Sequence, residues 1–344
     1  MSRPVVTFLL KILVSLGLLL FLFSWTNVND LLKVLVSAHP SYLVLVLAVY
    51  LAGQIISSLR WALLARPLGF KNPFKDFAAF YFIGMFFNLF APSTVGGDVG
   101  RVLYLARGAG DPRRSRWVGR TGAALTSVVA DRAIGMAVLV WVGATALVIF
   151  PVYSLPLTVR YLTFALALGL LISWVLLPVL YRLIQQMVNP LGKSLALAIE
   201  AYTSKRQMIV QTILLSLVVH FGQAGSQVLV GWSLDLNIPW SYSFILYPLV
   251  GLFSAIPISF NGIGLREGGY LFMLQRIEVG PEKAVAFGLL WFIIVALESM
   301  IGGVVFIVRK GQGLQPSSLG SEIRSSSGER LWPSRERREI QKRL

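Results

Sequence analysis

Six long apolar runs dominate the pattern of hydrophobic and polar residues along the chain. A helix needs about 20 predominantly apolar residues to cross the roughly 30 Å hydrocarbon core of a bilayer, and each run approaches or exceeds that length. The first run is expected to be a span and not a signal peptide, because no small-residue cleavage site follows it. The pattern predicts spans at 5–23, 42–65, 122–150, 159–181, 208–234 and 284–308.

Two further apolar segments, 77–106 and 242–274, are interrupted by residues that a simple span avoids. Such residues free backbone groups or bring charge into hydrocarbon, which the membrane tolerates only against protein or a watery cavity. We therefore expect each segment to form a re-entrant helical hairpin. The interrupting residues of the first segment are Pro92, Gly96, Gly97, Asp98 and Arg101.

The second interrupted segment repeats the spacing of the first. Paired Gly/Pro-interrupted segments in the two halves of a chain point to the binding site of transporters built from inverted repeats. The sequence thus predicts an all-α integral membrane protein, with six spans and two opposed hairpins arranged as inverted repeats; eight spans are the alternative. The aligned pairs are Pro92 with Pro257, Gly96 with Asn261, Gly97 with Gly262, and Arg101 with Arg266.

The glycines and prolines of the two hairpins are expected to shape the backbone by allowing bends and tight turns. Proline removes a helical hydrogen bond and so favours bending at Pro92 and Pro257. Glycine permits tight turns and close helix packing, and we expect this role, and not the cradling of a phosphate, at Gly262 and Gly264.

Composition agrees with a membrane protein, and the charges predict an orientation. Hydrophobic residues make up 56% of the chain, charged residues 13%, and mean hydropathy is +0.72. This composition is more apolar than that of soluble domains. The net charge of +16 comes from loops and tail, as the positive-inside rule requires, and not from a nucleic-acid-binding face. We expect a membrane domain over 1–310 and a basic, disordered cytoplasmic tail over 311–344. Both termini are expected in the cytoplasm of a bacterial or archaeal cell, with the first hairpin entering from that side and the second from outside.

Ionisable residues within the apolar segments are the candidates for function. Arg101 and Arg266 each offer a planar fork that suits a lipid phosphate, and an interfacial anchor is the alternative. Asp98 and Glu267 either position these arginines or only neutralise them. Asn261 belongs to the same set through the repeat.

The full spans carry three more candidates. Asp131 and Arg132 are adjacent, and about 100° separates neighbours on a helix, so each is expected to find a different partner or to form a structural ion pair with a hairpin. Glu298 has the same alternatives and is also a candidate proton site. Arg60 is expected to reach the interface. His220 is expected to be a core histidine bonded to a neighbouring helix, with a proton relay as the alternative.

The chain has no cysteine, which excludes disulfides and thiol chemistry. It has no Walker loop, dinucleotide fingerprint, HExxH sequence or serine-triad signature. We therefore expect no cofactor, no metal and no catalytic activity.

Three motifs carry a family resemblance: GGDVGR at 96–101, VADRAIG at 129–135 and PISFNGIGLREGG at 257–269. Together they resemble the lysylphosphatidylglycerol synthase transmembrane family, also called the flippase-like or UPF0104 family. The resemblance implies an integral membrane protein that moves or handles lipids. Since the sequence ends soon after the last span, a stand-alone form without the synthase domain is expected.

Three functions fit these observations. The first is translocation of an anionic or zwitterionic lipid or lipid-linked intermediate between leaflets. The alternatives are an enzyme acting on a polyprenyl-phosphate or similar lipid, and a scaffold for a lipid-modifying enzyme. Membrane lipids are the expected partners, with a lipid-modifying enzyme or glycosyltransferase as a further partner and no nucleic acid.

Overall fold

The computed structural model describes residues 3–90, 95–107, 114–176, 205–256 and 258–311, together with positions 179, 182, 200 and 202. Residues 1–303 form one compact unit, and the residues from 304 onward form a second. The described part of the second unit, 304–311, is the last stretch of a helix.

Long helices follow the predicted spans. Five helices are long and apolar enough to cross a membrane, and α1 with the short α2 (Val28–Val36) makes a sixth candidate. No β-strand occurs in the described ranges, so the prediction of an all-α membrane protein is confirmed. The long helices are α1 (Arg3–Ser24), α3 (Pro40–Ala65), α6 (Arg114–Ile149), α7 (Leu157–Val175), α10 (Arg206–Ser233) and α13 (Pro281–Gly311).

The chain bends by 93° between α1 and α2. The side chain of Asn27 accepts a hydrogen bond from the backbone N–H of Asn29 at 3.0 Å and so caps the new helix. Asp30 lies in the first turn of α2, where the helix dipole favours a negative charge. Asn27 and Asp30 thus stabilise the start of a new helix at the point where the chain bends away from the first span.

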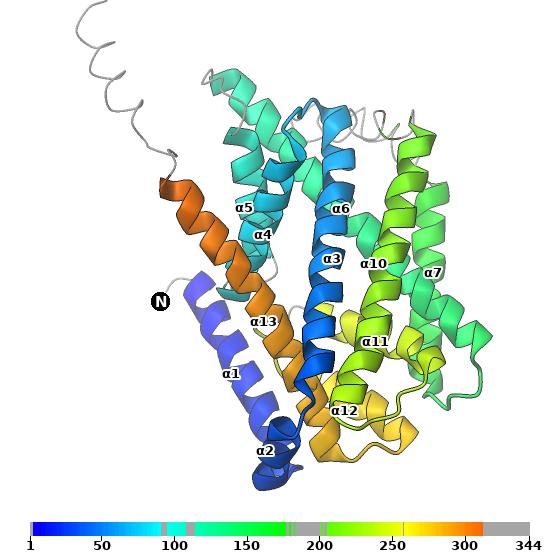
Figure 1. Cartoon of the computed structure of the whole chain (residues 1–344). Coiled ribbons are helices and arrows are strands. Elements are labelled where there is room, and N and C mark those ends of the chain that lie inside the picture. Colours follow the sequence, from blue (N-terminus) through cyan, green and yellow to red (C-terminus); the bar gives the residue numbers. More distant parts are fainter. Residues whose placement is uncertain are drawn as a thin grey trace, which may run out of the picture. The chain divides into compact units, whose positions relative to one another are not determined.

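Two pairs of shorter helices occupy the interrupted segments. Even the longest of these helices reaches only about 26 Å at 1.5 Å per residue, less than the roughly 30 Å hydrocarbon core. Each pair begins and ends at the same end of the bundle in Figure 1 and so forms a hairpin instead of two spans. The first pair is α4 (Phe74–Phe90) and α5 (Val95–Arg107), and the second is α11 (Trp240–Ala255) and α12 (Leu265–Leu274).

The two hairpins enter the bundle from opposite ends (Figure 1). The first lies between the end of α3 and the start of α6, whereas the second lies between the end of α10 and the start of α13. The relation of the two halves by an inverted repeat stays a prediction. Pro92 and Pro257, the expected hinges, lie outside the described residues.

Glycines let the first hairpin pack at backbone distance. A Cβ on Gly97 of α5 would overlap the carbonyl oxygen of Gly84 on α4, and a Cβ on Gly302 of α13 would overlap the carbonyl oxygen of Phe82. Helices in membranes associate through such small residues because lipid supplies no hydrophobic drive. As a result α4 is held between α5 and α13.

Each hairpin has its own apolar core. Trp61, Phe77 and Leu105 are fully buried around the first hairpin. Tyr242 and Tyr270 are fully buried around the second, and the Tyr242 hydroxyl donates a hydrogen bond to the Met273 carbonyl oxygen. This packing fixes both hairpins to the long helices, which positions the polar residues near their tips.

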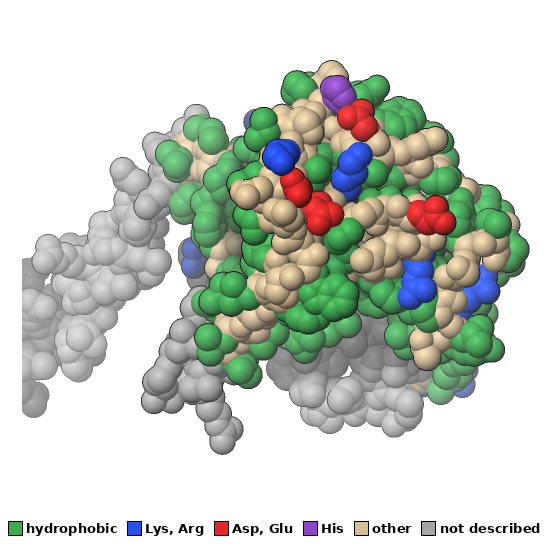
Figure 2. Space-filling view, turned by 90° about the horizontal axis from the view of Figure 1, so that it is seen from below, with side chains coloured by type: hydrophobic (Ala, Val, Ile, Leu, Met, Phe, Trp, Pro, Cys, Tyr) green, Lys and Arg blue, Asp and Glu red, His purple; other side chains and the backbone are tan. Residues whose placement is uncertain are grey.

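The two ends of the bundle differ in charge. Figure 2 shows the end at the bottom of Figure 1, where acidic and basic side chains are interspersed among hydrophobic ones. Loops of this end contact one another: the Tyr153 hydroxyl lies 2.6 Å from Ser241 Oγ, and His39 lies 3.2 Å from Asp235. The connections at the opposite end are mainly basic, with Arg66, Lys71, Lys75, Arg107 and Arg206.

Candidate functional site

A polar cavity of about 200 Å³ lies between the first hairpin and the tip of the second. Residues of α3, α4, α5, α6 and α13 line it, together with the connection between α11 and α12. It therefore combines segments from both ends of the sequence. Four of the predicted site residues share its wall: Asp98, Arg101, Arg132 and Asn261.

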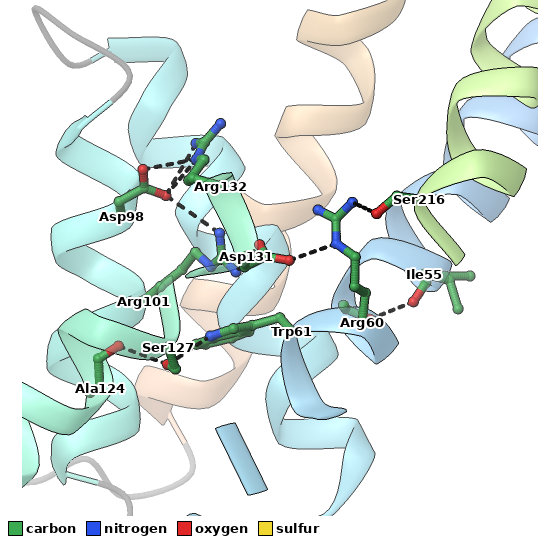
Figure 3. A network of polar contacts seen from close by, with 11 residues as sticks. Ile55, Arg60, Trp61, Asp98, Arg101, Ala124, Ser127, Asp131, Arg132 and Ser216 are labelled. Carbon is green, nitrogen blue, oxygen red and sulfur yellow. Dashed lines mark hydrogen bonds and ion pairs between the residues drawn. The ribbon is translucent and has the colours of Figure 1, made fainter. Parts of the chain in front are cut away.

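Asp131 on α6 joins three helices next to this cavity (Figure 3). Its Oδ1 accepts a hydrogen bond from Arg60 Nε on α3, and its Oδ2 accepts one from Arg101 on α5, both at 2.8 Å. Arg60 also donates to Ser216 Oγ on α10 at 2.8 Å. All four side chains are buried, and a buried carboxylate needs such partners to remain charged.

Arg101 is held between two aromatic rings. Its guanidinium carbon lies 4.2 Å from the ring centroid of Trp61 and 4.5 Å from that of Tyr81, within the range of a cation–π contact. Trp61 is itself fixed by a hydrogen bond from its Nε1 to Ser127 Oγ at 3.1 Å. A Cβ on Gly84 would lie 2.8 Å from Arg101 Cγ, so this glycine leaves the room that the arginine needs.

Arg132 pairs with Asp98, which Arg101 Nη1 also approaches at 3.4 Å. Its Nε lies 2.9 Å from Asp98 Oδ2 and its second terminal nitrogen lies 3.1 Å from Oδ1, which makes a bidentate contact (Figure 3). The Arg132 side chain is 50% exposed, whereas those of Arg101 and Asp131 are almost fully buried. Arg132 is therefore the guanidinium of the cluster that a ligand reaches most easily.

The adjacent residues Asp131 and Arg132 point to different partners, as the helical angle predicted. Three arginines, Arg60, Arg101 and Arg132, meet two carboxylates, Asp98 and Asp131, so the cluster carries one net positive charge. In a low-dielectric region an excess charge strongly favours an anionic ligand. The geometry of the cluster thus suits a phosphate group.

The tip of the first hairpin is closed by an amide. Asn88 Oδ1 on α4 accepts a hydrogen bond from the backbone N–H of Gly97 at 2.7 Å, next to Gly96. This contact satisfies one of the free N–H groups at the start of α5. Asn88 also lines the cavity, and its NH₂ group has no hydrogen bond to another described residue.

The second hairpin uses its polar residues mainly for its own backbone. Asn261, Gly262 and Gly264 all have positive φ, the region that glycine adopts without strain. Glu267 Oε2 accepts from the backbone N–H of Gly264 at 2.6 Å, and Oε1 accepts from Arg266 at 2.9 Å. Arg266 and Glu267 are buried and do not line the polar cavity.

Glu298 on α13 is buried near the cavity and does not line it. Its neighbour Ser299 and the preceding turn's Val295 are both in the cavity wall. Its Oε2 has no hydrogen-bond partner among the described residues. His220 on α10 lies 2.9 Å from the carbonyl oxygen of Gly135 and 3.3 Å from the Tyr247 hydroxyl, consistent with the expected core histidine.

Arg60 is the main residue that the sequence reasoning misplaced. It was expected at the membrane interface but is buried and paired with Asp131. The signal that could have placed it is the small and polar face before it, because Gly53, Ser57 and Ser58 are also buried. A cation that follows such a face on an apolar helix points into the bundle.

A second, apolar groove of about 320 Å³ lies between α6, α10 and α11. Trp141, Phe221 and Phe244 are among the side chains that line it. It contains no charged residue and is separate in its lining from the polar cavity. The polar cavity is therefore the candidate site.

The comparisons with known proteins agree with this fold. The sequence matches the family described as the lysylphosphatidylglycerol synthase TM region over residues 8–303. It is also 25% identical over 167 residues to a UPF0104 membrane protein of Methanocaldococcus jannaschii, an alignment that covers 48% of this chain and 45% of that relative. Because the family match covers most of the chain, including both hairpins and the whole polar cavity, this multi-pass membrane protein belongs to the lysylphosphatidylglycerol synthase TM region family.

Proposed function

We propose that this protein moves an anionic or zwitterionic lipid, or a lipid-linked intermediate, between the two leaflets of its membrane. The observation that carries the proposal is the polar cavity, which both hairpins line and which contains Asp98, Arg101, Arg132 and Asn261. A lipid head group needs such a polar path because hydrocarbon does not solvate it. The cavity would hold the head group while the acyl chains stay in the bilayer.

Arg132 and Arg101 have different roles in this proposal. Arg132 is half exposed, so a phosphate can compete with Asp98 for its fork. Arg101 is buried between two rings and held by Asp131, so it supplies fixed positive charge at the inner wall. Asp131 is a positioning residue, since it acts through Arg60 and Arg101.

The second hairpin would supply the counterpart on the other side of the path. In this proposal Arg266 and Glu267 become accessible when the second hairpin moves, and Asn261 already contributes to the shared cavity. Glu298, beside the cavity wall, would be the site that couples movement to protons.

We propose transport and not catalysis for this cavity because its carboxylate is already paired. Asp98 is bound by Arg132, and the nearby Asp131 is bound by Arg60 and Arg101. A carboxylate held in this way is a poor general base. We further propose that the protein lies in a bacterial or archaeal cell membrane; the basic connections at one end of the bundle favour an orientation with both termini in the cytoplasm. A lipid-modifying enzyme or glycosyltransferase would supply the lipid.

The test is a reconstituted assay with fluorescent lipids and a bleaching agent that acts only on the outer leaflet. Liposomes containing the protein should bleach beyond the outer-leaflet fraction. Arg132→Gln should slow this phase by about tenfold or more, since it removes about 1.4 kcal/mol or more of head-group binding. The matched control is Arg206→Gln, on the exposed start of α10, which should leave the rate unchanged. Bleaching equal to that of empty liposomes, or a wild-type rate in Arg132→Gln, would refute the proposal.

A further inference from the structure

We infer that the head group recognised in the polar cavity is a phosphodiester that carries hydroxyl groups and no amine. The inference rests on the proposed function and narrows its substrate class. Three features of the cavity wall carry it: a lining carboxylate that is already paired, a pair of lining rings of which one is already covered by an arginine, and a set of amide side chains.

Asp98, the carboxylate in the cavity wall, leaves no oxygen free for an ammonium group; Glu298, whose Oε2 is unpaired among the described residues, does not line the cavity. Asp98 has both oxygens within 3.1 Å of Arg132, and Asp131 accepts from Arg60 and Arg101 at 2.8 Å. An amine would have to displace one of these guanidinium groups and would face the excess positive charge of the cluster. Head groups such as ethanolamine or an aminoacyl ester are therefore disfavoured.

The aromatic residues do not form a cage for a quaternary ammonium. Such cages present open ring faces to the cation. Of the described residues, only two rings line the cavity, those of Tyr50 and Tyr81, and the guanidinium carbon of Arg101 already lies 4.5 Å from the ring centroid of Tyr81. A choline head group would find no open pair of rings in the cavity.

Amide side chains from three different elements line the cavity instead. They are Gln54 on α3, Asn88 on α4 and Asn261 at the tip of the second hairpin. Among the described residues no hydrogen bond joins the side chain of Gln54 or Asn261 to another residue, and Asn88 uses only its oxygen, for Gly97. These three side chains are only partly buried, so a ligand or water in the cavity can reach their free donors and acceptors.

Amides and hydroxyls match chemically. An amide has both donors and acceptors, as a hydroxyl does, whereas a phosphate only accepts and an ammonium only donates. Arg101 and Arg132 suit the phosphodiester, and the amides suit hydroxyls beside it. A glycerol, inositol or sugar esterified to a lipid phosphate combines both. A water molecule occupies about 30 Å³ in the liquid, so the cavity of about 200 Å³ has room for such a head group without its acyl chains.

The test compares glycerolipids that differ only in the head group, together with one polyprenyl lipid. Labelled phosphatidylglycerol and phosphatidylmethanol carry the same phosphodiester charge, but only the first has hydroxyls. Phosphatidylethanolamine and phosphatidylcholine test the amine, and a glycosyl polyprenyl phosphate tests whether the source is a polyprenyl lipid instead of a glycerolipid. Binding to the purified protein and movement in liposomes are measured separately for each lipid.

The expected result is that phosphatidylglycerol or the glycosyl lipid binds at least about tenfold more tightly than phosphatidylmethanol and the two amine lipids, because a site built for hydroxyls rejects analogues that lack them. Gln54→Met and Asn261→Gly should each reduce this preference; glycine suits the positive φ of position 261. Gln207→Met, on the exposed face of α10, is the matched control.

Equal binding of phosphatidylglycerol and phosphatidylmethanol, or tighter binding of an amine lipid, would overturn the inference while leaving lipid movement as proposed. Selective binding without movement would support the inference and refute the proposed transport. If none of the lipids binds or moves, both are wrong.

Discussion

Among single residues, Asp131 has the most consequential contacts of the site. Its two oxygens hold Arg60 and Arg101, and through Arg60 it reaches Ser216 on α10. A buried ion network of this kind adds little net stability compared with apolar packing, but removal of one member leaves the others uncompensated. The network therefore defines the position of Arg101 more than it strengthens the fold.

Asp131→Asn should destabilise the protein by about 3–5 kcal/mol, because two buried guanidinium groups lose their counter-charge. The measurement is the midpoint of thermal unfolding in detergent. Asp235→Asn is the control, since Asp235 is exposed and Asn tolerates its positive φ. A midpoint unchanged by Asp131→Asn would show that these arginines are solvated and that the network is not buried.

Lysine in place of Arg132 and of Arg101 should give different phenotypes. Arg132→Lys should slow lipid movement with little loss of stability, because a half-exposed fork becomes a point charge. Arg101→Lys should also lower the thermal midpoint, since it loses the stacking between Trp61 and Tyr81. Lipid movement and thermal unfolding are measured on the same preparations. Equal loss of stability in both variants would contradict the division into an accessible and a fixed arginine.

Sequence reasoning predicted the identities of the charged residues better than their partners. Asp98, Arg101 and Arg132 stood out because charge in an apolar segment is costly. Their pairing was not predictable, because it depends on how α3, α5 and α6 pack together. Arg60 was misplaced for a related reason: its distance along the chain from a helix end does not reveal which face of the helix it occupies.

For the helices, the first hairpin depends on two close crossings of α4. One is with α5 at Gly84 and Gly97, and the other is with α13 at Gly302. At both crossings the nearest atom is a backbone carbonyl oxygen, which cannot rotate out of the way as a side chain can. The space at these glycines is therefore required by the arrangement of whole helices.

Gly97→Ala should destabilise the hairpin by about 1–3 kcal/mol through overpacking, and lipid movement should fall with it. Gly100→Ala is the matched control on the same helix, where a new Cβ would lie 3.7 Å from the Phe87 ring, an ordinary contact. That control should be neutral or stabilising by up to about 1 kcal/mol, because alanine favours helix over glycine. The measurement is the midpoint of thermal unfolding of both variants. An unchanged midpoint in Gly97→Ala would show that α4 and α5 do not cross closely at this glycine.

The helices and the breaks within the two hairpins were largely predictable, whereas the bend between α1 and α2 was not. The six apolar runs gave α1, α3, α6, α7, α10 and α13, since span length and hydropathy are set by the bilayer. The bend before α2 was missed because the apolar pattern resumes after it. A local signal of a new helix start was nevertheless present: the capping residue Asn27, followed by Asp30 in the first turn of α2.

Across the whole molecule, the distribution of charge at the two ends should decide the orientation. The connection after α3 is basic, whereas the connections around Ser154 and Asn237 lie at the mixed end of the bundle. Lys and Arg are retained on the cytoplasmic side during insertion. The structure places these loops at opposite ends of the bundle, and the charges indicate that the basic end is the cytoplasmic one.

A single cysteine at Lys71 or Ser115 should react with a membrane-impermeant maleimide only from the cytoplasmic side, and one at Ser154 or Asn237 only from outside. The cysteine-free parent chain is the control. Labelling is measured on intact and on opened cells. The opposite pattern at all four positions would invert the proposed orientation, and a mixed pattern would contradict the arrangement of spans.

The two hairpins are expected to move relative to each other during transport. A crosslink between Gly97 and Gly262, the pair suggested by the aligned motifs, is unsuitable because neither position has room for a side chain: a Cβ on Gly97 would overlap the Gly84 carbonyl oxygen, and one on Gly262 would lie 3.0 Å from the Ser254 carbonyl oxygen. Leu89 on α4 and Asn261 at the second tip line the same cavity and are the better pair.

Cysteines at Leu89 and Asn261 should join through a short bifunctional reagent, since the cavity between them is only about 200 Å³. Alternating access requires the tips to separate, so the crosslink should stop lipid movement while lipid binding remains detectable. A pair at Leu89 and Leu171, the latter exposed on α7, should not join. Lipid movement that continues at the uncrosslinked rate in fully joined protein would mean that the tips need not separate. The path would then have to run along another face of the bundle, where the apolar groove between α6, α10 and α11 is the next candidate.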